Sequence, residues 1–155
     1  MNEQYTACAF TGNRNIGKDF SAGLMLTHIE TVIKKGVTVF YSGVARGFDL
    51  LAAEAILMFK GKYPQIKLIA CVPHIGQEKW YTEEEKARYY SVLKRADEVV
   101  TLSKTYYNGC MQKRNVYMVD RSDVIIAYNR EEKGGTVNTL SYCNKKYPEK
   151  EILYV

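Results

Sequence analysis

The residues of this chain that are best suited to chemistry lie in glycine-rich turns. Gly134, Gly135 and Thr136 follow an apolar run and open a helical pattern. Two glycines let the backbone approach a ligand closely, and the free N–H groups at a helix start can bind a phosphate. The hydroxyl of Thr136 could add a hydrogen bond. The alternative is a flexible turn in which Thr136 is an ordinary helix N-cap.

A second turn has a similar arrangement, in which Ser42 and Gly43 are followed by Gly47 and Asp49. We expect that a Cβ at Gly47 would intrude on an approaching phosphate or would require a negative φ. Asp49 falls at a predicted helix start, where its carboxylate could receive ribose hydroxyls or act as an acid–base group. It could also be a simple N-cap. The spacing is not G-x-G-x-x-G, so ordinary NAD binding is not indicated.

Two arginines could supply positive charge to the same region. Thr11, Gly12 and Arg14 end the first apolar run, and a guanidinium can hold a phosphate with two parallel hydrogen bonds. The alternative for Arg14 is a salt bridge at the sheet edge. Arg114 is the second candidate, and its alternative is a place on an exposed helix.

Aromatic side chains follow Pro73 and could form a wall over the pocket. Trp80 or Tyr81 would stack on a base there, although such side chains often serve packing alone. No nucleophile elbow or catalytic triad is visible. The four cysteines are scattered without a C-x-x-C pair and the chain has two histidines, so we expect neither a metal site nor a disulfide framework.

The elements that must position these turns alternate between strand and helix. Most of the strand candidates are continuous apolar runs, which is typical of strands buried on both faces. The pattern predicts an α/β, Rossmann-like, doubly wound and mostly parallel sheet with helices on both faces. All the turns would then meet at the carboxyl edge of the sheet, where such folds bind ligands. The predicted strands cover residues 5–10, 37–41, 66–72, 98–102, 124–128 and 152–155, and the predicted helices cover residues 18–35, 48–59, 82–96, 111–119 and 136–147.

The overall composition indicates one domain over residues 1–155. Hydrophobic residues make up 46% and charged residues 25% of the chain, which is ordinary for a globular protein. No apolar run approaches the ~20 residues of a membrane span, and no signal pattern opens the chain, so we expect a cytoplasmic protein without membrane contact.

The net charge of +5 favours an anionic partner, either a phosphate-bearing small molecule or nucleic acid. Homo-oligomer formation is left open.

These turns, taken together, resemble a known family. The chain is similar to the DUF1273/YpsA-like family of the SLOG superfamily, the Rossmann-like group that includes the DprA/Smf and LOG-like proteins. The matching segments run in order through nearly the whole chain. They are residues 11–14, 42–54, 73–80, 90–97, Tyr107, 112–123 and 134–136.

The resemblance implies a Rossmann-like fold with a pocket at the strand ends that binds nucleotides or ADP-ribose-like ligands. The glycine and the acidic residue that the family carries after its second strand correspond to Gly47 and Asp49. LOG-type phosphoribohydrolases are similar at the Gly134 turn, but they carry a catalytic Glu where this chain has Thr139. That departure weakens the case for hydrolysis and leaves phosphate binding intact.

Three hypotheses follow for the function. The first is a domain that binds or senses a nucleotide-derived ligand through the turns and Arg14, Arg114 and Asp49, with no other cofactor. The second is an enzyme that cleaves an N-glycosidic bond of such a ligand, with Asp49 as its acid–base residue; whether there is turnover is left open. The third is a DprA-like protein that binds single-stranded nucleic acid, which the charge and 13 tyrosines favour.

Overall fold

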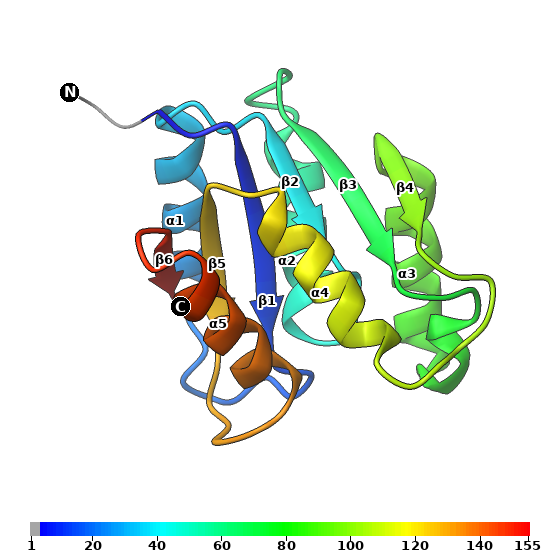
Figure 1. Ribbon diagram of the computed structural model, residues 1–155. Coiled ribbons are helices and arrows are strands. Elements are labelled where there is room, and N and C mark those ends of the chain that lie inside the picture. Colours follow the sequence, from blue (N-terminus) through cyan, green and yellow to red (C-terminus); the bar gives the residue numbers. More distant parts are fainter. Residues whose placement is uncertain (1–3) are drawn as a thin grey trace.

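The computed structural model describes residues 4–155, in which strands and helices alternate along the chain (Figure 1). The strand segments are rich in β-branched and other apolar residues, whereas the helical segments place apolar residues on one face. The elements are β1 (Ala7–Gly12), α1 (Ala22–Lys34), β2 (Val39–Ser42), α2 (Phe48–Phe59), β3 (Lys67–Val72), the 3₁₀ helix η1 (Gln77–Trp80), α3 (Glu83–Arg95), β4 (Glu98–Thr101), α4 (Cys110–Asp120), β5 (Val124–Tyr128), α5 (Gly135–Lys146) and β6 (Glu151–Tyr154).

The strands form one six-stranded sheet in the order β4-β3-β2-β1-β5-β6. Every neighbouring pair is parallel, so the predicted Rossmann-like α/β fold is confirmed. The chain first builds the sheet outward from β1 to β4 and then returns to add β5 on the other side of β1. The strand order therefore reverses between β1 and β5, and such a switch point is where open α/β sheets bind ligands.

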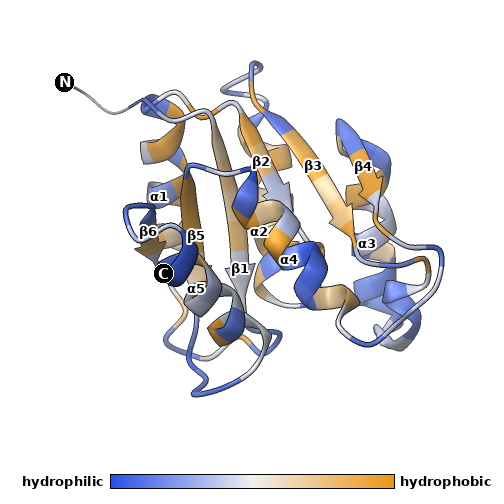
Figure 2. Ribbon diagram, viewed as in Figure 1, coloured by the Kyte–Doolittle hydropathy of each residue, from blue (hydrophilic) through white to orange (hydrophobic). Residues whose placement is uncertain are grey.

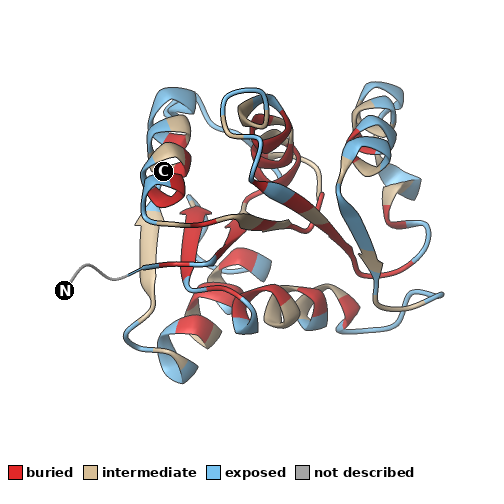
Figure 3. Cartoon of the chain, turned by 90° about the horizontal axis from the view of Figure 1, so that it is seen from above, coloured by how far each residue is buried: buried red, intermediate tan, exposed pale blue. Residues whose placement is uncertain are grey.

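Helices cover both faces of the sheet. Helices α1, α2 and α3 pack along one face, whereas α4 and α5 pack together on the other (Figures 1 and 3). The larger core lies under the first group and contains Phe10, Phe40 and Phe48. A smaller core under α4 and α5 contains Ile125 and Leu140. Figure 2 shows the hydrophobic residues that β3 and β5 contribute between these layers.

The predicted helix and strand segments agree with the structure except at their ends. Helix α1 begins at Ala22 rather than at residue 18, because the Ser21 side chain accepts a hydrogen bond from the backbone N–H of Leu24 and caps the helix there. At the start of α3, a Thr with a Glu three residues later is the sequence pattern of a capping box. The structure confirms it, since Thr82 and Glu85 exchange side-chain-to-backbone hydrogen bonds. Among the described residues, no helix combines the length and the hydropathy that crossing a membrane requires.

Candidate functional site

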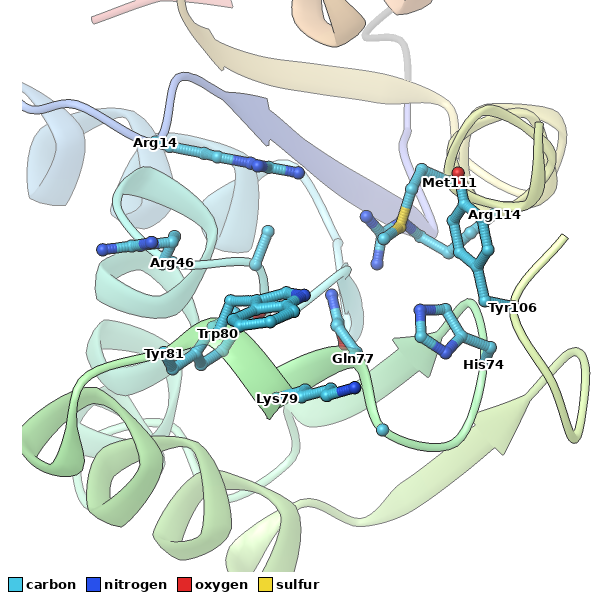
Figure 4. Close-up of a pocket in the computed structure, with 12 residues that line it drawn as sticks. Arg14, Arg46, His74, Gln77, Lys79, Trp80, Tyr81, Tyr106, Met111 and Arg114 are labelled. Atoms are coloured by element: carbon cyan, nitrogen blue, oxygen red, sulfur yellow. The ribbon is translucent and has the colours of Figure 1, made fainter. Parts of the chain in front are cut away.

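The carboxyl ends of the strands carry a two-lobed cavity beside the switch point. One lobe, of about 370 Å³, is bordered by the turns after β2 and β3 and by α4 (Figure 4). The other lobe, of about 320 Å³, lies between the turns after β1 and β5. Four residues line both lobes and so mark the junction between them: Arg14, Ala45, Met111 and Arg114.

The first lobe is lined by rings and cations, and we call it the aromatic lobe. Trp80 is 79% exposed and Tyr106 is 64% exposed, so both rings offer a free face. The buried His74 ring meets Tyr106 edge-on, with 5.4 Å between the ring centroids. The cations of this lobe are Arg14, Arg46, Lys79 and Arg114, and no carboxylate lines it among the described residues.

The second lobe is lined by hydroxyl, amide and carboxylate groups, and we call it the polar lobe. Its members beyond the junction are Thr11, Gly12, Asn13, Asn15, Asp49, Asn115, Glu131, Gly135 and Thr136. The turns after β1 and β5 and the start of α2 therefore meet in one cavity. Among the candidates from the sequence, Thr11, Gly12, Arg14, Asp49, Arg114, Gly135 and Thr136 line one or both lobes.

Arg114 is a buried cation at the junction and not a residue of an exposed helix face. Its side chain is held by three acceptors: Nη1 donates to the Gly43 carbonyl (2.6 Å) and the Cys71 carbonyl (3.1 Å), and Nε donates to Asn115 Oδ1 (2.9 Å). The residue is 4% exposed. Burial lowers the pKa of its guanidinium, but an arginine keeps its charge inside proteins. The exposed-helix alternative is therefore wrong.

Arg14 differs from Arg114 because it is exposed and, among the described residues, its side chain forms no hydrogen bond or ion pair. The salt bridge that was the alternative for Arg14 does not form within residues 4–155. Figure 4 shows the Arg14 and Arg114 guanidinium groups pointing toward each other across the cavity. The junction thus combines one fixed and one movable cation, an arrangement that suits an anionic group such as a phosphate.

Asp49 lies in the first turn of α2, inside the polar lobe, and it does not cap the helix. The N-cap is Gly47, without a side-chain hydrogen bond. Asp49 is 5% exposed, and its buried Oδ1 has no hydrogen-bond partner in the described part of the chain. Burial raises the pKa of the Asp49 carboxyl to about 7, although Arg114, Arg14 and a backbone hydrogen bond at Gly12 favour the charged form. A carboxyl group with such a pKa can exchange a proton near neutral pH.

The glycines of the second turn face protein rather than the cavity. A Cβ at Gly43 would come within 2.6 Å of Arg114 Cζ. At Gly47, which has a φ of 85°, a Cβ would meet the Arg14 carbonyl and come within 2.6 Å of the Asn13 oxygen. Of the two reasons that we gave for Gly47, the conformational one is confirmed by its positive φ. The close approach is made by backbone of the chain itself and not by a phosphate.

Two other candidates have structural contacts and line neither lobe. The Ser42 hydroxyl donates to the Asp49 carbonyl (2.8 Å) and accepts from the Val44 N–H (3.1 Å). Pro73 is buried behind the aromatic lobe. Tyr81 does line the aromatic lobe, but its hydroxyl donates to the Val44 carbonyl. Trp80 is thus the better placed of the two rings that we expected to stack.

The turn before α5 is open. Its N-cap is Gly134, which lacks a side-chain cap, so the alternative of Thr136 as N-cap is wrong. No atom lies within 4 Å of a Cβ built at Gly135, and the nearest atom to one at Gly134 is Glu131 Oε2, at 3.5 Å. Gly135 and Thr136 line the polar lobe, whereas Gly134 stands just outside it.

Sequence reasoning missed several lining residues. Met111 and Ala45 are uncharged and carried no signal of their own, and no role was predicted for the charges of Arg46, Lys79 and Glu131. A signal did exist for Arg114, because Cys110, Arg114 and Met118 are spaced four residues apart and form the buried side of α4. An arginine in that stripe must be buried and therefore needs acceptors.

The chain was compared with known families and curated proteins. The family model YpsA, described as the YspA SLOG family, matches residues 21–154. The uncharacterized SPbeta prophage-derived protein YoqJ of Bacillus subtilis is 35% identical over 130 residues, and the match covers 76% of each chain. A UPF0398 protein of Halalkalibacterium halodurans is 31% identical over 125 residues, which are 79% of this chain and 66% of that relative.

Solved structures share the fold. DNA processing protein A from Helicobacter pylori, solved to study its single-stranded DNA binding mode, aligns with a TM-score of 0.69 and 21% identity over 96% of this chain. DprA from Streptococcus pneumoniae aligns with a TM-score of 0.64 and 18% identity over 97%. The chain spans 64% and 50% of those two structures. The match to the family model over most of the chain, together with the identity to YoqJ, shows that this chain belongs to the YspA SLOG family.

Proposed function

We propose that this chain binds a nucleotide-derived small molecule across the two lobes, with a phosphate at the junction. The observation that carries the proposal is the pair Arg14 and Arg114, which lines both lobes at once. A ligand that filled both lobes would have to pass between these two guanidinium groups. A phosphodiester or diphosphate is the common chemical link that would gain from both of them.

Arg114 supports this proposal because its position is already fixed. An arginine has five N–H donors, and the acceptors described above engage Nε and Nη1, while Nη2 has no hydrogen-bond partner among the described residues. No carboxylate forms an ion pair with it within residues 4–155. Burying a cation is costly. The Asp49 carboxylate offsets part of that cost through its attraction to Arg114, and a bound anion would offset more of it.

The lining of the aromatic lobe suits a nucleobase, which would be the flat end of the ligand. Trp80 and Tyr106 expose ring faces at its mouth, and stacking of a base on an aromatic side chain contributes about 1–3 kcal/mol. Lys79 lies over the Trp80 ring, with its ammonium 5.1 Å from the ring centroid. This contact places positive charge beside the stacking surface.

An N-glycosidase activity at the same site is the second candidate, and Asp49 is the observation that favours it. Its carboxyl is buried in the polar lobe and has a pKa of about 7, which suits a general acid–base group at neutral pH. Binding without turnover remains our first proposal, because Thr139 occupies the position where LOG-type enzymes carry a catalytic Glu. Thr139 is buried, and its hydroxyl donates to the Gly135 carbonyl.

The test is a ligand panel measured by thermal shift and calorimetry, with chromatography to detect released base. AMP, ADP, ADP-ribose, NAD and a short single-stranded oligonucleotide are compared. We expect at least one small nucleotide to bind, and Arg14→Ala to weaken it by about tenfold to a hundredfold through loss of a charged hydrogen bond. Arg95→Ala, which removes an exposed arginine at the end of α3, is the matched control and should bind normally.

Three outcomes would contradict the binding proposal. If no small nucleotide binds, the cavity has another purpose. If Arg14→Ala and Arg95→Ala behave alike, the junction is not the phosphate site. If only the oligonucleotide binds, with an affinity that falls steeply with salt, the chain is a nucleic-acid binder. Base release that Asp49→Asn abolishes would instead establish the enzyme.

A further inference from the structure

The two lobes differ in the sign of the charges that each adds to the junction. Beyond the shared Arg14 and Arg114, the aromatic lobe has Arg46 and Lys79. The polar lobe has two carboxylates, Asp49 and Glu131, and no further cation among the described residues. Arg46 is ion-paired with Glu85 (3.2 Å), so Lys79 is the cation that the aromatic lobe adds without an ion-pair partner among the described residues, whereas the polar lobe adds only carboxylates. Phosphate groups are favoured at the junction and toward the aromatic lobe, and they are disfavoured deep in the polar lobe.

Glu131 places one of the two carboxylates of the polar lobe beside the start of α5. Its Oε2 lies 3.5 Å from a Cβ built at Gly134, so the carboxylate stands beside the N-cap of α5. Helix starts attract anions, and here an anion of the chain already stands next to that position. A terminal phosphate at this helix start would have to approach a carboxylate, and the repulsion between the two charges opposes its binding.

A structural role does not account for Glu131. Within residues 4–155 its carboxylate forms no hydrogen bond and no ion pair, and its side chain is exposed. The turn is held instead by its neighbours, because Asn129 Oδ1 accepts from the Glu131 N–H (3.2 Å) and Asn129 Nδ2 donates to the Glu131 carbonyl (3.1 Å). The carboxylate is thus free to accept hydrogen bonds from a ligand.

We propose that the group bound in the polar lobe is a neutral, hydroxyl-rich sugar and that Glu131 selects it over a terminal phosphate. This inference rests on the proposed function and names its substrate class: a nucleoside diphosphate joined to a second sugar. Carboxylates accept hydrogen bonds from hydroxyls, and Asp49 and Glu131 both line this lobe. The amide of Asn115 and the hydroxyl of Thr11 complete a set of groups suited to sugar hydroxyls.

The proposal departs from what the resemblance to LOG-type proteins leads us to expect at the Gly134 turn. In this chain the glycines are present, but the acidic side chain beside them changes which end of a ligand the turn favours. The base would occupy the aromatic lobe, the diphosphate the junction and the second sugar the polar lobe. The diphosphate would then meet cations, and the sugar hydroxyls would meet carboxylates that accept hydrogen bonds.

The experiment compares matched ligand pairs on the full chain at one ionic strength by calorimetry. ADP is compared with ADP-ribose, and UDP with UDP-glucose. At least one of the two pairs should bind the wild type. Within that pair, we expect the Kd of the sugar-bearing ligand to be at least about tenfold lower than that of the nucleoside diphosphate. Glu131→Ala should reverse this order: it loses hydrogen bonds to the sugar, and it opens the α5 start to the terminal phosphate of the nucleoside diphosphate. Glu132→Ala, which removes the adjacent exposed carboxylate that lines neither lobe, should keep the wild-type order.

The outcomes separate this inference from the proposed function. If ADP or UDP binds the wild type as tightly as its sugar-bearing partner, the inference is overturned while nucleotide binding stands. The same holds if Glu131→Ala and Glu132→Ala change the affinities equally. If no member of either pair binds, the proposed function fails and the inference fails with it. A reversal of preference confined to Glu131→Ala supports the inference.

Discussion

The two glycine-rich turns look alike in the sequence and have opposite surroundings in the structure. At the turn after β2, Gly43 packs against the Arg114 guanidinium and Gly47 packs against the backbone of Asn13 and Arg14. At the turn before α5, a Cβ built at Gly135 would meet no other part of the described chain within 4 Å. The first turn is thus closed by its own chain, and the second is open toward the cavity.

This difference shows what a glycine indicates. A glycine marks a place where a Cβ does not fit or where the backbone adopts a positive φ, but it does not say what approaches it. At Gly47 another loop of the same chain approaches, and the glycine allows the turns after β1 and β2 to touch. The Phe48 N–H donates to the Asn13 carbonyl across this contact (3.1 Å). The closed turn therefore shapes the wall of the cavity that the open turn faces.

Gly47→Ala is the strongest test of the closed turn. The new Cβ would collide with backbone atoms, and the φ of 85° is unfavourable for alanine. We expect a loss of about 3 kcal/mol or more in the free energy of unfolding, measured by urea denaturation. Gly109→Ala is the matched control. Gly109 has a φ of 94°, and a Cβ built there would meet no other atom of the described chain within 4 Å. Equal losses in the two variants would mean that φ alone explains Gly47.

Asp49→Asn tests the burial of the carboxyl that follows the closed turn. The folded pKa of about 7 lies above the ordinary value of 3.8 for this carboxyl group, so the folded state binds the proton more tightly than the unfolded chain. The stability from this group is fully present below pH 4 and is lost as the pH rises to about 7. The wild type should lose up to about 4 kcal/mol relative to Asp49→Asn across that range. Denaturation curves at several pH values measure this, and parallel pH profiles would contradict it.

Gly135→Ala tests the open turn and should have the smallest effect on stability. Its Cβ would meet no atom within 4 Å, and alanine is favoured over glycine in a helix by about 0.5–1 kcal/mol. We expect the free energy of unfolding to rise slightly while ligand affinity falls, because the methyl group occupies the cavity. Denaturation and calorimetry on the same sample separate the two effects. A destabilised variant would mean that this turn is as closed as the other.

Local patterns predicted most of the fold and part of the site. Apolar runs and helix caps act over a few residues, so the strands, the capping box at Thr82 and the meeting of the turns after β1 and β5 could be predicted. The environment of Arg114 could not, because its acceptors at Gly43 and Cys71 lie 71 and 43 residues away in the sequence. The position of Glu131 was missed for another reason: its turn is held by side-chain hydrogen bonds of Asn129, which no sequence pattern indicated.

The strand order has a consequence for how the protein is made. β1 gains its second neighbour when β5 is added, and the contacts Cys8↔Val124 and Gly12↔Tyr128 join the two strands over more than a hundred residues of sequence. On the ribosome, one edge of the central strand stays unpaired until most of the chain has emerged, and the sheet face under α4 and α5 stays bare as well. Contacts so distant in sequence slow folding. The nascent chain therefore exposes an unpaired strand edge until β5 is made, and the cavity at the strand ends is complete only after the start of α5 has been added.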